Sequence, residues 1–112
     1  MIINGINVRN LTPHTINILN TSGEEVYVIP AEGVIPRCSQ ENVEVGSLGN
    51  GVPIYQCVYG EVEDLPEETP NTLLIVSRLV VSACPTRKDL VSPGPLMRNA
   101  EGQPIGCMGL AH

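Results

Sequence analysis

Glycine and proline interrupt this chain along its whole length, with eleven glycines and ten prolines among 112 residues. Both residues tend to end regular elements, because glycine favours turns and proline lacks a backbone N–H. The segments between them are short, which suits strands and turns better than long helices. We therefore expect an α+β fold that is mostly β, a small open barrel or sandwich with one short helix.

Strands are predicted by residue patterns in the first half of the chain. Apolar and polar residues alternate in Ile6–Val8 and in Ile16–Ile18, and β-branched residues dominate Glu25–Ile29. Asn50-Gly51 is a strong hairpin signal because both residues tolerate positive φ, and it ends the most flexible-looking stretch of the sequence. We expect a strand over Val52–Val62 to follow this turn.

The second half predicts one buried strand, the single helix and a terminal hairpin. Thr72–Val76 is a continuous apolar run, which indicates a central strand buried on both faces. The helix is expected over Ser77–Cys84, capped by the Ser77 hydroxyl and ended by Pro85. Residues 96 to 107 should form the hairpin.

The core must be built from aliphatic side chains. The chain has no Phe, no Trp and only three Tyr, so the bulkiest core-forming residues are nearly absent. A chain of this length forms a single domain, residues 1–112, and buries a modest share of its surface. We expect a homo-oligomer, because a second subunit supplies further burial.

The net charge of −6 disfavours two classes of partner. Binding of nucleic acid or of an anionic membrane needs a positive field, so neither is expected. No apolar run approaches the length of a membrane span, and the first residues do not resemble a secretory signal. We therefore expect a cytoplasmic protein.

Catalytic and metal-binding signatures are missing from the sequence. There is no GxSxG, no HExxH and no closely spaced cysteine pair beside a histidine. We expect no enzyme activity, no cofactor and no metal site, with the cysteines reduced. The four cysteines are Cys38, Cys57, Cys84 and Cys107.

Positive charge gathers in one short part of the sequence. Residues 61–68 hold five acids, whereas residues 78–98 hold four of the six bases. Arginine and lysine side chains suit phosphate or carboxylate, and hydroxyl or backbone donors would complete an anion site. The alternative is that these bases pair with the acidic segment at the surface. The predicted anion-binding residues are Arg78, Arg87, Lys88, Arg98, Ser77, Ser92 and Gly94.

Three further side chains are candidates for ligand contacts. Tyr55 and Tyr59 are an even number of positions apart, so a regular strand places both on one face, where they could stack on a planar ring. Packing on a strand face or in the core is the other use for them. His14, after a proline in a turn, is a candidate for ligand contact or for a base.

Several segments resemble a family of small proteins found in phages, prophages and bacteria. The resemblance covers most of the chain, and the segments occur in the same order. It implies a phage or mobile-element setting but no settled biochemical activity. The segments are Asn10-Leu11-Thr12-Pro13-His14-Thr15-Ile16-Asn17-Ile18, Tyr59-Gly60-Glu61-Val62-Glu63-Asp64-Leu65-Pro66, Ile75-Val76-Ser77-Arg78-Leu79-Val80, and Arg87-Lys88-Asp89-Leu90-Val91-Ser92-Pro93-Gly94 to Ile105-Gly106-Cys107.

Small phage proteins of this setting include sponges, which bind nucleotide-derived immune signals and withhold them from host defence. We therefore expect an anti-defence sponge, in the host cytoplasm, whose partner is an anionic nucleotide or an ADP-ribose-like molecule. One alternative is a structural or protein-interaction module, such as a virion component or an inhibitor of a host protein. The other is a hydrolase of a nucleotide signal.

Overall fold

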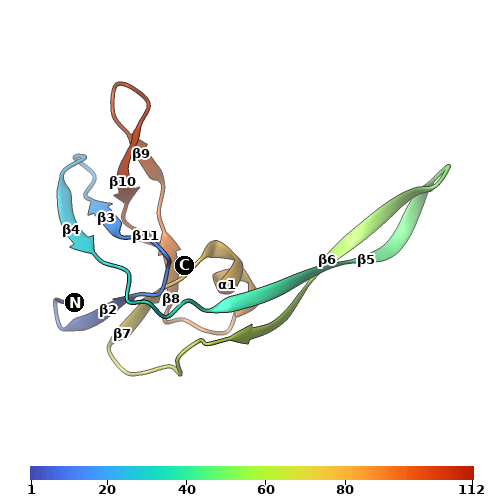
Figure 1. Cartoon of the computed structure of the whole chain (residues 1–112), viewed down its shortest axis with the longest axis horizontal. Coiled ribbons are helices and arrows are strands. Elements are labelled where there is room, and N and C mark those ends of the chain that lie inside the picture. Colours follow the sequence, from blue (N-terminus) through green and yellow to red (C-terminus); the bar gives the residue numbers. More distant parts are fainter.

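The computed structural model describes all 112 residues and contains eleven strands and one helix (Figure 1). The first sheet has five strands in the order β1-β2-β7-β8-β11, and its three inner strands are parallel. The second sheet has four strands in the order β4-β3-β10-β9, with the central pair parallel. The bounds in the first sheet are β1 (Ile2–Ile3), β2 (Ile6–Asn10), β7 (Thr72–Ile75), β8 (Leu90–Pro93) and β11 (Leu110–Ala111). Those in the second are β4 (Glu25–Ile29), β3 (Ile16–Leu19), β10 (Pro104–Met108) and β9 (Leu96–Arg98).

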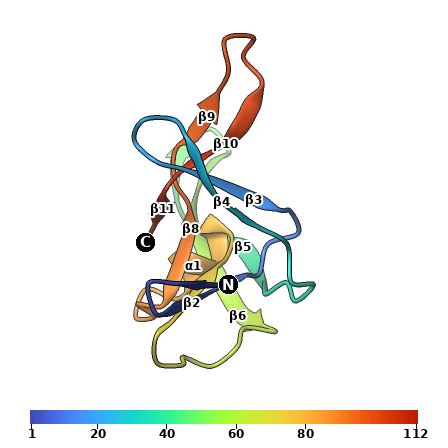
Figure 2. The same ribbon diagram turned by 90° about the vertical axis from the view of Figure 1, so that its left-hand side faces the viewer.

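The body of the molecule has three layers, which Figure 2 shows from the side opposite the long hairpin. One apolar cluster joins the two sheets: Val8, Ile16, Ile18, Ile29, Ile75, Val91 and Cys107. A second cluster lies on the other face of the first sheet, beneath the helix α1 (Arg78–Ala83): Leu11, Leu74, Val76, Val80 and Leu90. The first sheet is therefore the middle layer.

The fold class expected from the sequence is confirmed. The chain is mostly β with one short helix, and both sheets of the body are open, so neither closes into a barrel. Strands occupy the predicted positions around Ile6–Val8, Ile16–Ile18, Glu25–Ile29 and Val52–Val62. The hairpin predicted over residues 96 to 107 forms as β9 and β10.

Strand β7 is buried on both faces, as the apolar run over Thr72–Val76 predicts. Leu74 is 1 % exposed and Ile75 is 0 % exposed, and they belong to different clusters. Because successive side chains of a strand point to opposite faces, β7 contributes to both cores at once.

Helix α1 also lies where the sequence predicts it. The Ser77 hydroxyl accepts a hydrogen bond from the Val80 backbone N–H at 3.4 Å, and the helix ends at Ala83, with Cys84 as its C-cap directly before Pro85. Val80 faces the cluster and is 1 % exposed, whereas Leu79 is half-buried. The helix forms the crossover between the parallel strands β7 and β8.

The side chain of Asn10 holds three segments of the body together. Its Nδ2 donates to the carbonyl oxygens of His14 and Ile29, both at 2.8 Å. Its Oδ1 accepts from the backbone N–H of Thr12 at 3.0 Å and from the Thr12 hydroxyl at 2.6 Å. Asn10 is 1 % exposed, so water cannot replace these bonds. The segment Asn10–His14 thus has a structural role.

The remaining strands, β5 (Arg37–Gly49) and β6 (Val52–Glu63), pair only with each other and project from the body as a long hairpin (Figure 1). We call residues 39–61 the arm. The stretch before Asn50-Gly51, which looked flexible in the sequence, continues β5 as far as the predicted turn. The arm gives the chain a radius of gyration of 17.2 Å, against about 13 Å for a compact domain of this length.

Replacing Asn10 by Ala should lower the free energy of unfolding by about 2–4 kcal/mol, because buried donors and acceptors lose their partners. Urea unfolding followed by circular dichroism measures this change. Asn20→Ala is the control, since the Asn20 Oδ1 also accepts two hydrogen bonds, both from backbone N–H groups, but the residue is exposed. The free energy of unfolding of Asn20→Ala should fall by less than about 1 kcal/mol, and equal losses in both variants would contradict the role of Asn10.

Candidate functional site

The arm carries two chemically different faces. Residues opposite each other in an antiparallel pair share a face, and successive pairs alternate. By the observed register, one face presents Val43, Val52, Ile54 and Val58 together with Glu41 and Gln56, and we call it the aliphatic face. The other, the tyrosine face, presents Gln40, Asn42, Glu44, Ser47, Pro53, Tyr55, Cys57 and Tyr59. The expectation that the two tyrosines share a face is confirmed.

Nothing in the structure covers the arm. Every residue from 39 to 61 except Pro53 is exposed, and half of the exposed large hydrophobic side chains of the chain lie in this segment. The four apolar side chains of the aliphatic face are between 42 % and 47 % exposed, and Leu48 at the tip is 78 % exposed. Exposed apolar patches of this kind mark interaction surfaces.

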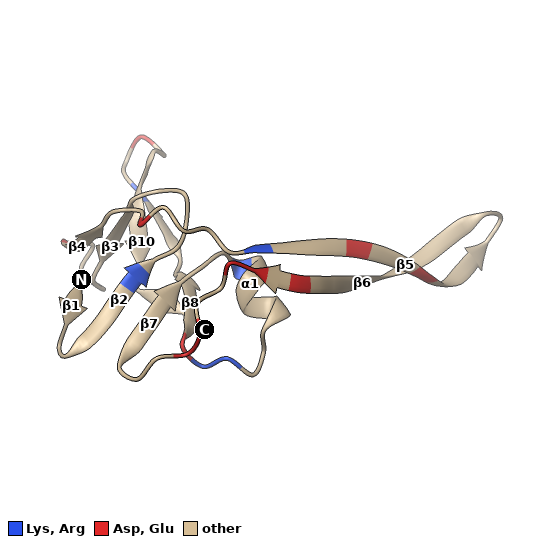
Figure 3. Ribbon diagram, turned by 60° about the horizontal axis from the view of Figure 1, so that its bottom comes forward, with Lys and Arg blue, Asp and Glu red and all other residues tan.

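Charge is distributed unevenly along the arm (Figure 3). Glu41 and Glu44 lie in its inner half, and Glu61 and Glu63 lie near the base, whereas residues 45–60 carry no charged side chain. The outer half of the arm is therefore both apolar and neutral. Depletion of charge is typical of the centre of protein interfaces.

Three of the predicted anion-binding residues hold the C-terminal strand instead. The Arg78 guanidinium donates to the His112 carbonyl oxygen at 2.9 Å, and the Ser92 hydroxyl donates to the Ala111 carbonyl at 3.4 Å. The backbone N–H of Gly94 donates to the Gly109 carbonyl at 2.9 Å, and a Cβ at Gly94 would overlap the Met108 carbonyl oxygen. Each of these groups therefore uses a donor within the fold.

Arg87 forms an ion pair with a buried acid. Its guanidinium makes two hydrogen bonds to the Asp89 carboxylate, at 2.8 and 2.7 Å, and a third to the Pro66 carbonyl oxygen at 2.9 Å. The hydrogen bonds from Arg87 hold the pKa of Asp89 below its usual range, although burial acts in the opposite direction. Glu68 lies 4.0 Å away, so Arg87 does pair with the acidic segment.

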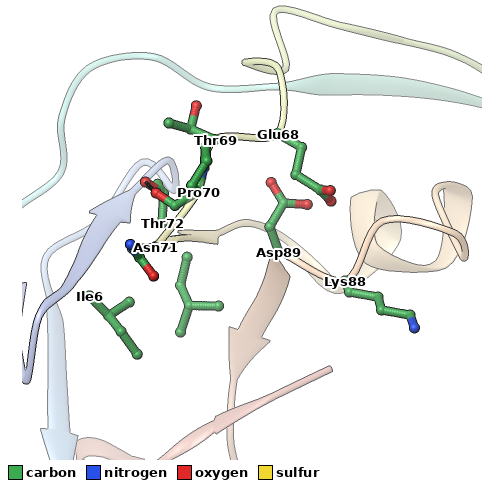
Figure 4. Close-up of a pocket in the computed structure, with 9 residues that line it drawn as sticks. Ile6, Glu68, Thr69, Pro70, Asn71, Thr72, Lys88 and Asp89 are labelled. Atoms are coloured by element: carbon green, nitrogen blue, oxygen red, sulfur yellow. Dashed lines mark hydrogen bonds between the residues drawn. The ribbon is translucent and has the colours of Figure 1, made fainter.

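A polar hollow of about 450 Å³ adjoins this ion pair (Figure 4). Glu68 and Asp89 form its acidic side, and the side chain of Lys88 points away from the other lining residues. The hollow therefore has a negative rather than a positive wall. The remaining lining residues are Ile6, Thr69, Pro70, Asn71, Thr72 and Leu73.

The other predicted site residues lie apart from one another. Arg98 is on the β9–β10 hairpin and donates to the Gly102 carbonyl at 2.8 Å, while the His14 side chain is exposed between β2 and β3. Tyr55 and Tyr59 are on the arm. The structure thus separates the ten predicted residues into several places. The arm as a docking surface was not predicted, although the neutral run from residue 45 to 60 is visible in the sequence.

Four of the six basic side chains make no ion pair: Arg37, Arg78, Lys88 and Arg98. Of the other two, Arg87 pairs with Asp89 and Arg9 binds the Glu32 carboxylate. No group of three His, Cys, Asp or Glu side chains is placed to hold a metal ion, and all four cysteines are free. The structure has no helix with the length and apolar character needed to cross a bilayer.

Comparison of the chain with protein-family models, with curated proteins and with solved structures finds no match. The resemblance to small phage and prophage proteins stays a prediction. Function is therefore inferred from the arm, the hollows and the charges described above.

Replacing Asp89 by Asn should destabilise the protein by about 1–3 kcal/mol at neutral pH, because Arg87 loses its charged acceptor. A carboxylate whose pKa is lowered on folding stabilises the native state above its unfolded pKa and loses that effect as the pH falls through the folded value. The difference between wild type and Asp89→Asn should therefore shrink below about pH 3.9.

Urea unfolding at a series of pH values from 7 to 3 measures this difference. Glu101→Gln serves as the control, because Glu101 is exposed in a turn and makes no ion pair. The change in unfolding free energy caused by Glu101→Gln should stay within about 0.5 kcal/mol at every pH. A constant difference for Asp89→Asn across this range would contradict the ion-pair account.

Proposed function

We propose that this protein is a non-catalytic interaction module that docks on a protein partner through its arm. The setting we propose for it is a phage or other mobile element, in which it serves as an assembly component or an inhibitor. The observation that carries this proposal is the uncovered aliphatic face on a hairpin that pairs with no other strand.

The energetics of the arm support a docking role. A two-stranded hairpin without further packing is at best marginally stable in water. Covering the half-exposed Val43, Val52, Ile54 and Val58 would remove apolar surface from water and stabilise a complex by roughly 3–5 kcal/mol. The strands β5 and β6 also leave free backbone groups along both edges of the arm, which a partner strand can pair with.

The body of the protein supports binding over catalysis. A nucleophile or general base must lie within hydrogen-bond reach of a partner that activates or orients it. His14 is the one histidine outside the C-terminus, and no hydrogen bond joins its ring to a serine, cysteine or carboxylate. The acids of the polar hollow are paired with Arg87 or face solvent.

Footprinting with a carbene-forming reagent in a lysate of cells that produce the protein should show the arm protected. Labelling of Val43 and Ile54 should fall several-fold relative to the urea-unfolded chain, because a partner covers the aliphatic face. Val26 and Val28 on β4 are matched controls, since they are 48 % and 43 % exposed on the body. Labelling of Val43 and Ile54 equal to that of these controls would contradict the proposal.

A second candidate function is the sequestration of an anionic, nucleotide-like or ADP-ribose-like molecule without turnover. It is favoured by the predicted cations that make no ion pair, Arg78, Lys88 and Arg98. Arg78 begins α1, and Lys88 follows the same helix five residues after its end. Such a ligand would have to avoid the acidic wall of the polar hollow.

A thermal-shift screen against cyclic and linear nucleotides and ADP-ribose derivatives tests this candidate. A ligand at 100 times its dissociation constant should stabilise the fold by about 2.7 kcal/mol, which raises Tm by several degrees. The ligand should be recovered intact, and the shift should shrink in Lys88→Ala but persist in Lys88→Arg. No shift with any compound would remove the candidate.

A further inference from the structure

We propose that the arm's partner is a second copy of this chain. Two arms pack aliphatic face to aliphatic face about a two-fold axis and run in opposite directions, so that each tip lies against the base of the other arm. This inference rests on the proposed docking function and names its partner.

The aliphatic face is suited to contact with itself. Its apolar side chains are all β-branched aliphatics, so two copies interdigitate as the inner faces of a small β-sandwich do. Four strands then replace an isolated two-stranded hairpin, and the apolar face that the hairpin leaves in water becomes a shared core. The arm points away from its own body, so the same chain cannot cover this face (Figure 1).

The charges select the antiparallel arrangement. Glu41 lies on the aliphatic face in the inner half of the arm, whereas residues 45–60 are uncharged. When the arms run in opposite directions with each tip at the partner's base, the two Glu41 side chains lie on opposite sides of the two-fold axis, about three residues apart along the arms. A parallel arrangement would place the two Glu41 side chains together, and like charges at close range repel each other.

The base of the arm carries a hollow for the partner's tip. It has a volume of about 610 Å³ and is lined in part by Val34, Ile35 and Leu65. Arg37 also lines it and is four positions before Glu41 on β5, so strand alternation puts both side chains on the same face of the hairpin. Leu48, the most exposed large hydrophobic residue of the chain, lies about 36 Å along β5 from Arg37. Two antiparallel arms that overlap over this whole length place Leu48 of one chain beside Arg37 of the other.

The area of the contact is also appropriate. One face of a two-stranded ribbon ten residues long covers roughly 300–400 Å², which is about half of what a stable interface buries on each partner. The tip and the base hollow of each chain add to this area and bring it closer to the usual ~800 Å². The antiparallel two-fold arrangement supplies both additions at once.

Sedimentation equilibrium of the purified chain tests the inference, with twice the 12.0 kDa of one chain as the expected mass. Val43→Glu should weaken dimerisation at least about 100-fold, because a two-fold interface receives the buried charge twice. Asn42→Glu is the matched control: it adds the same charge one residue away on the tyrosine face and should change the dissociation constant less than about threefold. Both variants should keep the far-UV circular dichroism spectrum of the wild type, which shows that each chain folds.

A double-mutant cycle tests the antiparallel direction. Leu48→Ala and Val34→Ala change opposite ends of the arm, so they cannot interact within one chain. If the tip occupies the partner's base, the two substitutions remove the same contact. The dissociation constant of the double variant should then be close to that of the single variant with the larger loss of affinity. Additive effects on the dissociation constant would overturn this arrangement.

Other outcomes separate this inference from the docking function. A chain that stays monomeric at concentrations on the order of 100 µM, while its arm is protected in lysate, overturns the second copy and leaves the docking function standing. If Val43 and Ile54 are labelled as fully as Val26 both in lysate and in the purified protein, the second copy and the docking function are both overturned. Large species that disappear in Ile6→Glu, a change at an exposed residue that lines the apolar hollow of about 280 Å³ on the body, would show head-to-tail contact and would overturn the two-fold dimer.

Discussion

Strand β7 must bury side chains on both of its faces, and the other layers of the body are arranged around this requirement. Leu74 and Val76 need cover on one side and Ile75 needs it on the other, so one sheet alone cannot satisfy the strand. Helix α1 covers the first side and the second sheet covers the other. With no Phe or Trp to fill space, both cores are built mainly from Val, Ile and Leu.

The same constraint positions the arm. Val62, near the end of β6, packs against the cluster beneath α1 and anchors the base of the hairpin to the helix side of the body. Beyond that anchor the chain offers the arm nothing to pack on. The apolar side chains of the arm then have water as their neighbour, which is why a partner for this surface explains the structure better than a purely internal role does.

Residues that are close in sequence and alike in chemistry do not converge on one site here. Arg87 satisfies buried Asp89, and Arg78 satisfies a backbone carbonyl at the C-terminus. Asp89 is buried and therefore needs a strong donor, because an unpaired polar group in the interior is costly. The hydrogen bond of Arg78 is exposed. Sequence reasoning could recognise that these side chains bind oxygen, but it could not identify which oxygen they bind.

Local patterns in the sequence determined much of the secondary structure. Alternation identified β2 and β3, the apolar run identified β7, a serine and a proline bounded α1, and Asn50-Gly51 marked the turn of the arm. These signals are local, because they depend on backbone preferences and on side chains a few positions apart. Tertiary structure alone decided the parallel pairing of β2 with β7, the role of Asn10 and the exposure of the arm. Each of these depends on which distant segments meet, and the alternation within β5 and β6 is the same whether the hairpin lies in a core or projects into solvent.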